Sequence, residues 1–361
     1  MTLLKNIARL LRLSPGAVQS PPVAVRGRVD HVVILDGTMS SLIEGCETNA
    51  GLAFKLIREI APTARMSVRY EAGVQWRQWR NTLDVIRGTG INRQICRAYG
   101  FIASRYRTGD RIFLFGYSRG AYGVRSLAGV IDRVGLLRAE HATERNITLA
   151  YRHYQCAPDT EASREFSRLY CHPNVEIEMI GLWDTVKALG IRAPILWRFS
   201  AGRYAFHNHH LGQSIRHGFH ALAMDETREA YAPVLWQCPP KWRGEMRQMW
   251  FRGSHGDIGG QIGMYEAARP LANIPLVWIL EQAESCGLSL PADWRAGFAT
   301  NPNSPSVGTW KGWGMFFLAR RKRIIGRDPS ESVHPSALEH HPAATLARGD
   351  LFPWQGDSEN P

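Results

Sequence analysis

The chain has 361 residues, of which 44% are hydrophobic and 21% are charged, and its formal net charge is +12 at pH 7. This composition is that of an ordinary globular protein, and the length fits one large α/β domain with or without insertions. The positive charge favours an anionic partner such as acidic lipid, nucleic acid or an acidic protein. The arginines are spread along the whole chain, however, and this pattern serves solubility equally well.

Cysteine spacing and hydropathy exclude further classes of protein. The six cysteines contain no Cys-x-x-Cys pair, which favours free thiols in a reducing compartment over a disulfide framework or a zinc site. No apolar run reaches the roughly 20 residues that span a bilayer. The N-terminal segment is amphipathic and basic, but Arg9 and Arg12 interrupt it, which argues against a signal peptide. We therefore expect a cytoplasmic protein, in which this segment either contacts a membrane surface or packs on the core.

Secondary-structure patterns in chain order predict strands that alternate with helices. The expected strands lie at 31–35, 67–70, 111–115, 176–183 and 246–251, and the expected helices at 52–60, 91–106, 121–131, 215–230 and 274–286. This alternation predicts an α/β fold of the α/β-hydrolase type. Its mainly parallel sheet has helices on both faces and inserted helical and loop segments.

Proline, glycine and charge patterns set the expected domain limits. Residues 1–28 are interpreted as an amphipathic N-terminal segment and linker, 29–345 as the α/β domain and 346–361 as a flexible tail. The stretch 301–312 is rich in proline, glycine and serine, and we expect a loop there. The sequence shows no internal repeat.

The run Gly116-Tyr117-Ser118-Arg119-Gly120 carries the strongest functional signal. It lies between a predicted strand and a predicted helix, which is the position of a nucleophile elbow. Glycines are needed two residues before and after the serine, because side chains there would collide with the neighbouring strand and helix. The backbone N–H of Arg119, at the helix N-terminus, would face developing oxyanion charge. Ser118 is therefore the candidate nucleophile.

A base and an acid follow Ser118 in the order typical of α/β-hydrolases. Asp184 comes at the carboxyl end of a predicted strand, and His255 follows a later strand in a glycine-rich loop. Because the carboxyl ends of parallel strands meet at one edge of a sheet, these side chains can converge. Asp257 and Asp225 are the alternative acids, since an aspartate after a strand often serves only as a helix N-cap.

The turn Asp36-Gly37-Thr38 is the candidate for the second oxyanion donor, which usually comes from a loop after an early strand. Gly37 permits close approach of the backbone to a substrate. Asp36 either caps the turn or contacts substrate, and the sequence leaves both interpretations open.

Five histidines crowd one short segment, at positions 207, 209, 210, 217 and 220. On a helix, His217 and His220 would share a face. No cysteine or carboxylate completes an obvious ligand set, so we expect no metal and no cofactor. His220, Asp257 and Asp225 are instead expected in the surroundings of the catalytic residues.

A basic and apolar stretch lies at 310–325. Trp313, Phe316 and Phe317 precede the cluster Arg320-Arg321-Lys322-Arg323. This pattern is typical of a surface that contacts anionic lipid. It fits equally well a buried pair of phenylalanines beside a solvated basic face.

Together these motifs resemble the DUF2235 family of α/β-hydrolases, which includes the catalytic domain of the first class of type VI secretion lipase effectors. The resemblance extends over residues 30–340. It rests on Leu35-Asp36-Gly37-Thr38, the string from Phe113 to Ala121, Leu182-Trp183-Asp184-Thr185-Val186, His220-Ala221-Leu222-Ala223-Met224-Asp225-Glu226, and His255-Gly256-Asp257-Ile258-Gly259-Gly260. Met39 stands where the family usually has a tryptophan.

The resemblance implies a bacterial serine ester hydrolase with its triad on Ser118, Asp184 and His255. In the best-known members the activity is phospholipase A-type cleavage of glycerophospholipid. The resemblance also implies a delivery or immunity protein as a partner and export by a type VI system. No nucleic-acid reader motif occurs, so we expect no specific nucleic acid. The alternatives are a soluble carboxylesterase on small esters and a non-catalytic binding module on a hydrolase scaffold.

Overall fold

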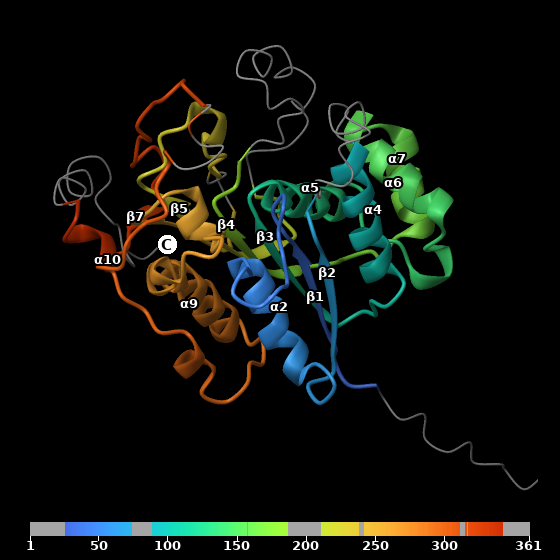
Figure 1. The fold of residues 1–361 in the computed structure, drawn as a ribbon. Coiled ribbons are helices and arrows are strands. Elements are labelled where there is room, and N and C mark those ends of the chain that lie inside the picture. The colour runs from blue at the N-terminus through green and yellow to red at the C-terminus, as the bar shows by residue number, and fades with distance from the viewer. Residues whose placement is uncertain are drawn as a thin grey trace, which may run out of the picture.

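A seven-stranded, all-parallel sheet lies at the centre of the computed structural model (Figure 1). The structure describes residues 26–73, 89–156, 158–186, 211–237, 242–310, 315 and 317–341. The strand order is β2-β1-β3-β4-β5-β6-β7. The strands are β1 (Asp30–Leu35), β2 (Met66–Glu71), β3 (Arg111–Tyr117), β4 (Ile177–Trp183), β5 (Ile215–Ala223), β6 (Glu245–Phe251) and β7 (Glu331–Val333).

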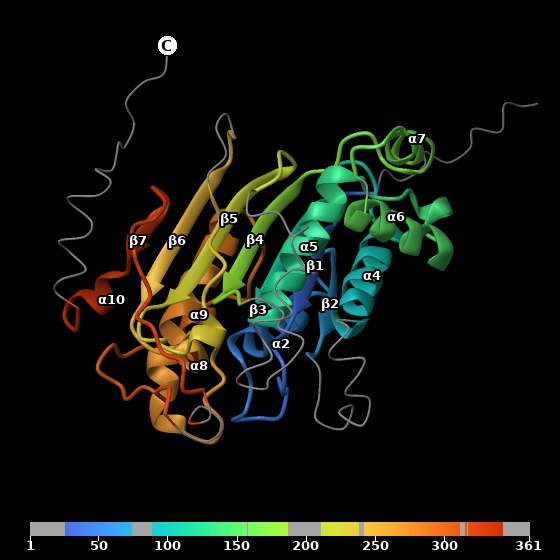
Figure 2. The same ribbon diagram turned by 90° about the horizontal axis from the view of Figure 1, so that it is seen from above.

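Helices cover both faces of the sheet, as Figure 2 shows. One face carries α4 (Thr89–Ala103), α5 (Arg119–Arg133), α6 (Glu144–Cys156) and α7 (Glu161–Tyr170). The other carries α2 (Asn49–Ile60), α8 (His255–Gly259) and α9 (Arg269–Ser285), and α10 (Pro335–Leu338) follows β7. Four short 3₁₀ helices complete the described elements: η2 (Ala139–His141), η5 (Glu229–Tyr231), η6 (Glu266–Ala268) and η7 (Trp294–Gly297).

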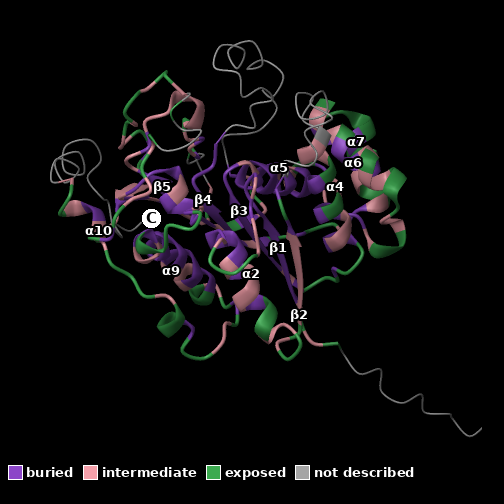
Figure 3. Ribbon diagram, in the orientation of Figure 1, coloured by how far each residue is buried: buried purple, intermediate pink, exposed green. Residues whose placement is uncertain are grey.

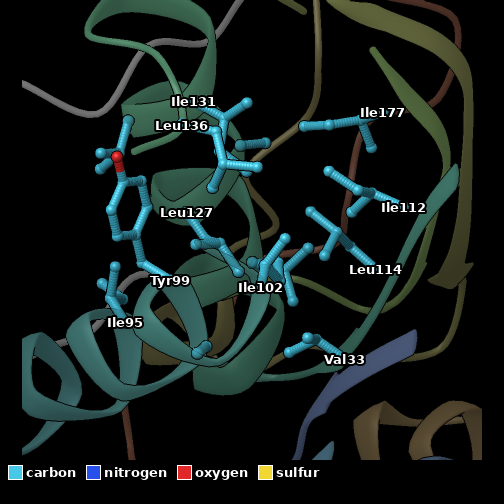
Figure 4. Close-up of a cluster of buried hydrophobic side chains, with 14 of the residues drawn as sticks. Val33, Ile95, Tyr99, Ile102, Ile112, Leu114, Leu127, Ile131, Leu136 and Ile177 are labelled. Atoms are coloured by element: carbon cyan, nitrogen blue, oxygen red, sulfur yellow. The ribbon is translucent and has the colours of Figure 1, made fainter. Parts of the chain in front are cut away.

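The central strands are buried on both faces, so apolar side chains alternate between two cores (Figure 3). Val33, Ile112 and Leu114 join the core beneath α4 and α5, where Ile102, Leu127 and Ile131 pack on them (Figure 4). The intervening residues Val32, Phe113 and Phe115 join the core on the α2 and α9 side. This double burial explains the continuous apolar runs that mark the strands in the sequence.

The strand order places a topological switch point between β1 and β3. The chain leaves β1 toward β2 on one side and returns to β3 on the other. Ligand sites of open α/β sheets form at such points, outside the carboxyl ends of the strands. The turn after β1 and the serine after β3 therefore lie side by side.

The predicted fold class is confirmed: the structure is an all-parallel sheet with helices on both faces. The predicted helix over 215–230 is wrong, because this segment forms strand β5 followed by η5. Strand β5 pairs with β4 and β6 and is buried on both faces from Gly218 onward, so its apolar run carries no strand period. Helices α6, α7, α8 and α10 and strand β7 were not predicted, and His255, expected in a glycine-rich loop, is the first residue of α8.

Several predictions fall on residues that the structure does not describe. They are the N-terminal segment up to residue 25, Trp313, Phe316 and the tail 346–361. The proposed domain limits therefore remain predictions. Within the described ranges, no helix has the length and apolar character needed to cross a bilayer.

Candidate active site

Ser118 occupies a strained turn between β3 and α5. Its backbone has φ 57° and ψ −119°, and it is the N-cap of α5. A side chain at Gly116 would place its Cβ 2.6 Å from the Cα of Ala121, and one at Gly120 would place it 2.6 Å from the carbonyl oxygen of Asp36. Both glycines are thus required by close packing of strand, turn and helix, as the sequence predicts. A non-glycine residue at positive φ is uncommon and is typical of functional sites.

His255 faces Ser118 from the first turn of α8. Its Nε2 lies 2.9 Å from the Ser118 Oγ. The imidazole is stacked on Tyr117 with ring centroids 5.0 Å apart, and the ring of Tyr231 meets it in a T-shaped arrangement at 4.9 Å. Burial lowers the pKa of His255 below its usual 6.5, outweighing the Asp184 carboxylate, which raises it. The ring is therefore held neutral and ready to accept a proton.

Asp184 lies behind His255, directly after β4. Its Oδ2 is 2.6 Å from the His255 Nδ1, and its Oδ1 accepts the backbone N–H of Ala223 at 3.0 Å. The guanidinium of Arg323 binds both carboxylate oxygens, at 2.6 and 2.9 Å. Burial raises the pKa of this carboxyl, but Arg323 and His255 outweigh it and hold the pKa well below its usual range. Asp184 is thus a buried anion with every oxygen hydrogen-bonded.

The two alternative acids bind elsewhere. Asp257 accepts hydrogen bonds from the backbone N–H and hydroxyl of Ser254, the N–H of Val307 and the hydroxyl of Ser306. It therefore caps α8 and ties it to the following loop. Asp225 accepts the N–H of Gly253 at 2.7 Å and pairs with His341 at 2.9 Å. Of the three aspartates, only Asp184 has a hydrogen bond to His255 among the described residues.

His220 supports the strand end that carries Asp184. Its Nε2 accepts the backbone N–H of Thr185 at 3.1 Å, which places the ring proton on Nδ1. Burial lowers its pKa to about 3. The predicted face shared with His217 is wrong, because residues three apart on a strand point to opposite faces. His207, His209 and His210 lie outside the described residues. Within the described part of the chain, no group of three or more metal-ligating side chains could hold a metal ion.

The turn after β1 lies against the elbow. A Cβ at Gly37 would lie 3.3 Å from the Cβ of Ser118. The Asp36 carboxylate accepts the Gly37 N–H, the Thr48 hydroxyl and the Tyr70 hydroxyl, each at 2.6 Å. Burial raises the pKa of Asp36 to about 6. Asp36 therefore caps the turn, and the N–H of Gly37 is already occupied.

Three residues near His255 were not identified from the sequence. Glu226 accepts the backbone N–H of His255 at 3.2 Å and pairs with Arg228. Tyr231 packs against the imidazole, and Arg323 binds Asp184. Glu226 and Tyr231 come from the segment after β5, and Arg323 comes from the segment before β7. Glu226 ends the string from His220 that supports the family resemblance, but no motif marks Tyr231 or Arg323. Arg323 belongs to a cluster whose pattern is that of an exposed basic surface.

Comparisons with known proteins place this chain in a family. Residues 30–282 match the model of the catalytic domain of Tle1-like phospholipase effectors of type VI secretion systems. An uncharacterized protein of Saccharomyces cerevisiae, YEL023C, is 32% identical over 175 residues, which make up 45% of this chain and 24% of that protein.

Two solved structures are also similar. An uncharacterized protein from Pseudomonas aeruginosa has 15% identity and a TM-score of 0.40, covering 76% of this chain and 49% of that one. A Tle1 effector bound to the VgrG spike of a type VI system has 18% identity and a TM-score of 0.35, covering 68% and 53%. The chain thus spans about a quarter of the yeast relative and about half of each solved chain. On the family match, which covers most of its length, the chain belongs to the Tle1-like phospholipase effector family, within its catalytic domain.

Proposed function

We propose that the protein is a serine ester hydrolase that cleaves glycerophospholipid. The observation that supports it best is the chain of hydrogen bonds from the Ser118 Oγ through His255 to Asp184, with distances of 2.9 and 2.6 Å. This chain starts on a strained elbow at the carboxyl edge of a parallel sheet. Membership of a phospholipase effector family supports the same class of substrate.

In this mechanism the Ser118 Oγ attacks the ester carbonyl carbon while the His255 Nε2 takes the hydroxyl proton. The imidazolium then returns this proton to the leaving alcohol, which leaves an acyl-serine. Water attacks the acyl-serine with His255 again as the base, and the fatty acid is released. Asp184 orients the Nδ1 proton and stabilises the positive charge of His255 in both steps.

Two backbone donors are proposed for the oxyanion. The Arg119 N–H belongs to the first residue of α5, where the helix dipole favours negative charge. The Thr38 N–H is the second donor, because the Gly37 N–H is bonded to Asp36 and no described residue accepts from Thr38. A well-placed oxyanion donor contributes about 3 kcal/mol to the transition state.

Exposed apolar side chains support a lipid substrate. They lie on the loops after β1, after α8 and before β7, which carry or adjoin the site: Ile43, Met264, Trp310, Leu318 and Ile324. Met264 is 89% exposed and Leu318 is 77% exposed, and exposed Arg321 and Lys322 lie between Leu318 and Ile324 in the sequence. Such a mixture is typical of a surface that enters the headgroup region of an anionic bilayer. Peripheral membrane contact through these loops is part of the proposal.

Family membership extends the proposal to export by a type VI system, with a delivery or immunity protein as a partner. A soluble carboxylesterase on small esters is the alternative, since it uses the same three side chains without a lipid-facing surface. A non-catalytic binding module is less compatible with a hydrogen-bonded Ser118, because a binder needs no activated hydroxyl.

The test compares the wild type with Ser118→Ala on vesicles of phosphatidylglycerol and phosphatidylethanolamine, with released fatty acid as the readout. We expect Ser118→Ala to lower turnover by about 10⁴-fold or more. Ser67→Ala is the matched control, because Ser67 also hydrogen-bonds a histidine, His31, at 2.6 Å. It should retain wild-type activity and labelling by a fluorophosphonate.

Three outcomes distinguish the candidates. Fatty acid release that depends on Ser118 supports the phospholipase. Cleavage of p-nitrophenyl butyrate without release of fatty acid from the vesicles supports the carboxylesterase that acts on small soluble esters. Absence of both, together with no fluorophosphonate labelling of the folded wild type, rejects the serine hydrolase and favours a binding module.

A further inference from the structure

We infer that Arg323 is a positioning residue of this site, which holds the acid in place and sets the pH at which His255 becomes a base. Arg323 lies outside residues 30–282, over which the family model matches. The inference rests on the function proposed above for Ser118, His255 and Asp184.

The first observation is the geometry of the Arg323 side chain, which is only 4% exposed. Its two terminal nitrogens bind the two carboxylate oxygens of Asp184, which is the planar, bidentate arrangement in which arginine recognises a carboxylate. The same nitrogens donate to the carbonyl oxygens of Ala223 at 2.8 Å and Tyr231 at 2.6 Å. Arg323 thus links the ends of β4 and β5 to η5.

The second observation is that two of these partners, Asp184 and Tyr231, contact His255. Asp184 has φ 39°, in the left-handed region that non-glycine residues adopt uncommonly. Tyr231 packs its ring against the imidazole of His255. Arg323 therefore fixes both the acid that bonds His255 and the aromatic ring that limits the movement of His255.

The third observation concerns the loop that delivers Arg323. Its backbone is anchored without the guanidinium, because residues 319–321 form hydrogen bonds with residues 227–229: Glu229 N donates to Ala319 O at 3.0 Å, and Arg321 N donates to Thr227 O at 2.7 Å. On the far side, Gly326 N donates to the Glu331 carboxylate. A change at Arg323 can therefore alter the site while the loop stays in place.

Electrostatics gives the consequence. The groups that face His255 are Asp184, Glu226, Arg228, Tyr117, Tyr231 and Ser118, with Arg323 behind Asp184. A guanidinium on the Asp184 carboxylate offsets part of the negative charge that would stabilise the His255 imidazolium. Arg323 thereby keeps His255 neutral at lower pH, so that the site works as a base under more acidic conditions.

The test uses three variants of the full chain: Arg323→Gln, Arg323→Lys and Arg327→Gln. Glutamine removes the charge, lysine keeps the charge without the two-pronged geometry, and Arg327 is an exposed arginine of the same segment before β7. The readouts are the pH profile of kcat/KM on p-nitrophenyl butyrate and the NMR titration of the His255 ring. Thermal unfolding confirms that each variant is folded.

For Arg323→Gln we expect the acidic limb of the profile and the His255 titration to move up by about one pH unit. For Arg323→Lys we expect the limb to stay near the wild-type position while kcat falls, since charge is kept and geometry lost. Arg327→Gln should match the wild type within about twofold. A folded Arg323→Gln whose limb and His255 titration stay at the wild-type pH, or move down, overturns the inference.

The two proposals fail in different ways. If the wild type hydrolyses no ester but the His255 titration moves in Arg323→Gln, the positioning role stands and the proposed function fails. If Ser118-dependent hydrolysis is present and neither readout moves, the proposed function stands and the role of Arg323 is purely structural.

Discussion

Two buried clusters in this chain contain the same three residue types, and their comparison shows what separates a structural from a catalytic arrangement. His31 contacts Ser67 at 2.6 Å and Asp110 at 3.0 Å, at the amino ends of β1, β2 and β3. There the serine lies within a regular strand and the cluster ties neighbouring strands together. Ser118 instead lies at positive φ, at the start of a helix and at the carboxyl edge of the sheet. Backbone context, more than side-chain identity, supports the assignment of chemistry to Ser118.

Asp184→Asn is the sharpest residue-scale test of the acid. The amide keeps the shape of the side chain but presents an N–H or a neutral oxygen to the His255 Nδ1, so the tautomer and the charge stabilisation are lost. We expect kcat/KM on p-nitrophenyl butyrate to fall by about 10³–10⁴-fold at pH 7. Asp225→Asn, which changes a carboxylate bonded to Gly253 and His341, should stay within about threefold of the wild type. Equal losses in the two variants would contradict the assignment of Asp184.

At the scale of elements, the glycine pattern and the strand–helix order predicted the elbow, because the constraint is local. Glycines two positions before and after the serine mark the elbow in the sequence, because the close packing of strand, turn and helix leaves no room for side chains there. Strand β5 was misassigned because it is buried on both faces and its apolar residues follow no period of two. The order Ser118, Asp184, His255 was predicted because each follows a strand of one parallel sheet. Tyr231 ends η5 and Arg323 lies in the segment before β7, and their proximity to His255 and Asp184 leaves no local signal in the sequence.

The elbow itself is tested by Gly120→Ala. The added methyl would lie 2.6 Å from the Asp36 carbonyl oxygen and even nearer to that of Leu35, so β1 and the start of α5 would have to separate. Overpacking of this kind costs about 1–3 kcal/mol and would also displace Ser118 from His255. We expect a lower midpoint of denaturant unfolding together with a loss of activity. Gly297→Ala is the matched control, because nothing lies within 4 Å of its added Cβ. Wild-type stability in Gly120→Ala would show that the elbow tolerates a wider turn.

At the scale of the whole molecule, buried titratable groups make stability depend on pH. Burial lowers the pKa of His220 to about 3 and that of His334 to about 4. Below pH 6.5 these two histidines are therefore protonated in the unfolded chain but neutral in the native protein. The free energy of unfolding falls as the pH decreases from 6.5 toward these values. Asp36 acts in the opposite direction. Burial raises its pKa to about 6 from 3.8, so the native protein binds a proton that the unfolded chain lacks between these values.

His220→Gln and Asp36→Asn should therefore change the pH dependence with opposite signs. In His220→Gln, an amide oxygen can accept the Thr185 N–H. The loss of stability that comes from protonation of His220 in the unfolded chain at acidic pH is then removed. In Asp36→Asn, the Thr48 and Tyr70 hydroxyls can turn to accept from the amide, and the stabilising proton uptake is removed. Between pH 6 and 5, we expect the slope of the free energy of unfolding against pH to differ from that of the wild type by about 1 kcal/mol per pH unit in each variant. The slope becomes less steep in His220→Gln and steeper in Asp36→Asn. Denaturant unfolding at both pH values measures the two slopes, and slopes that change in the same direction would contradict the ionisation states assigned to these two groups.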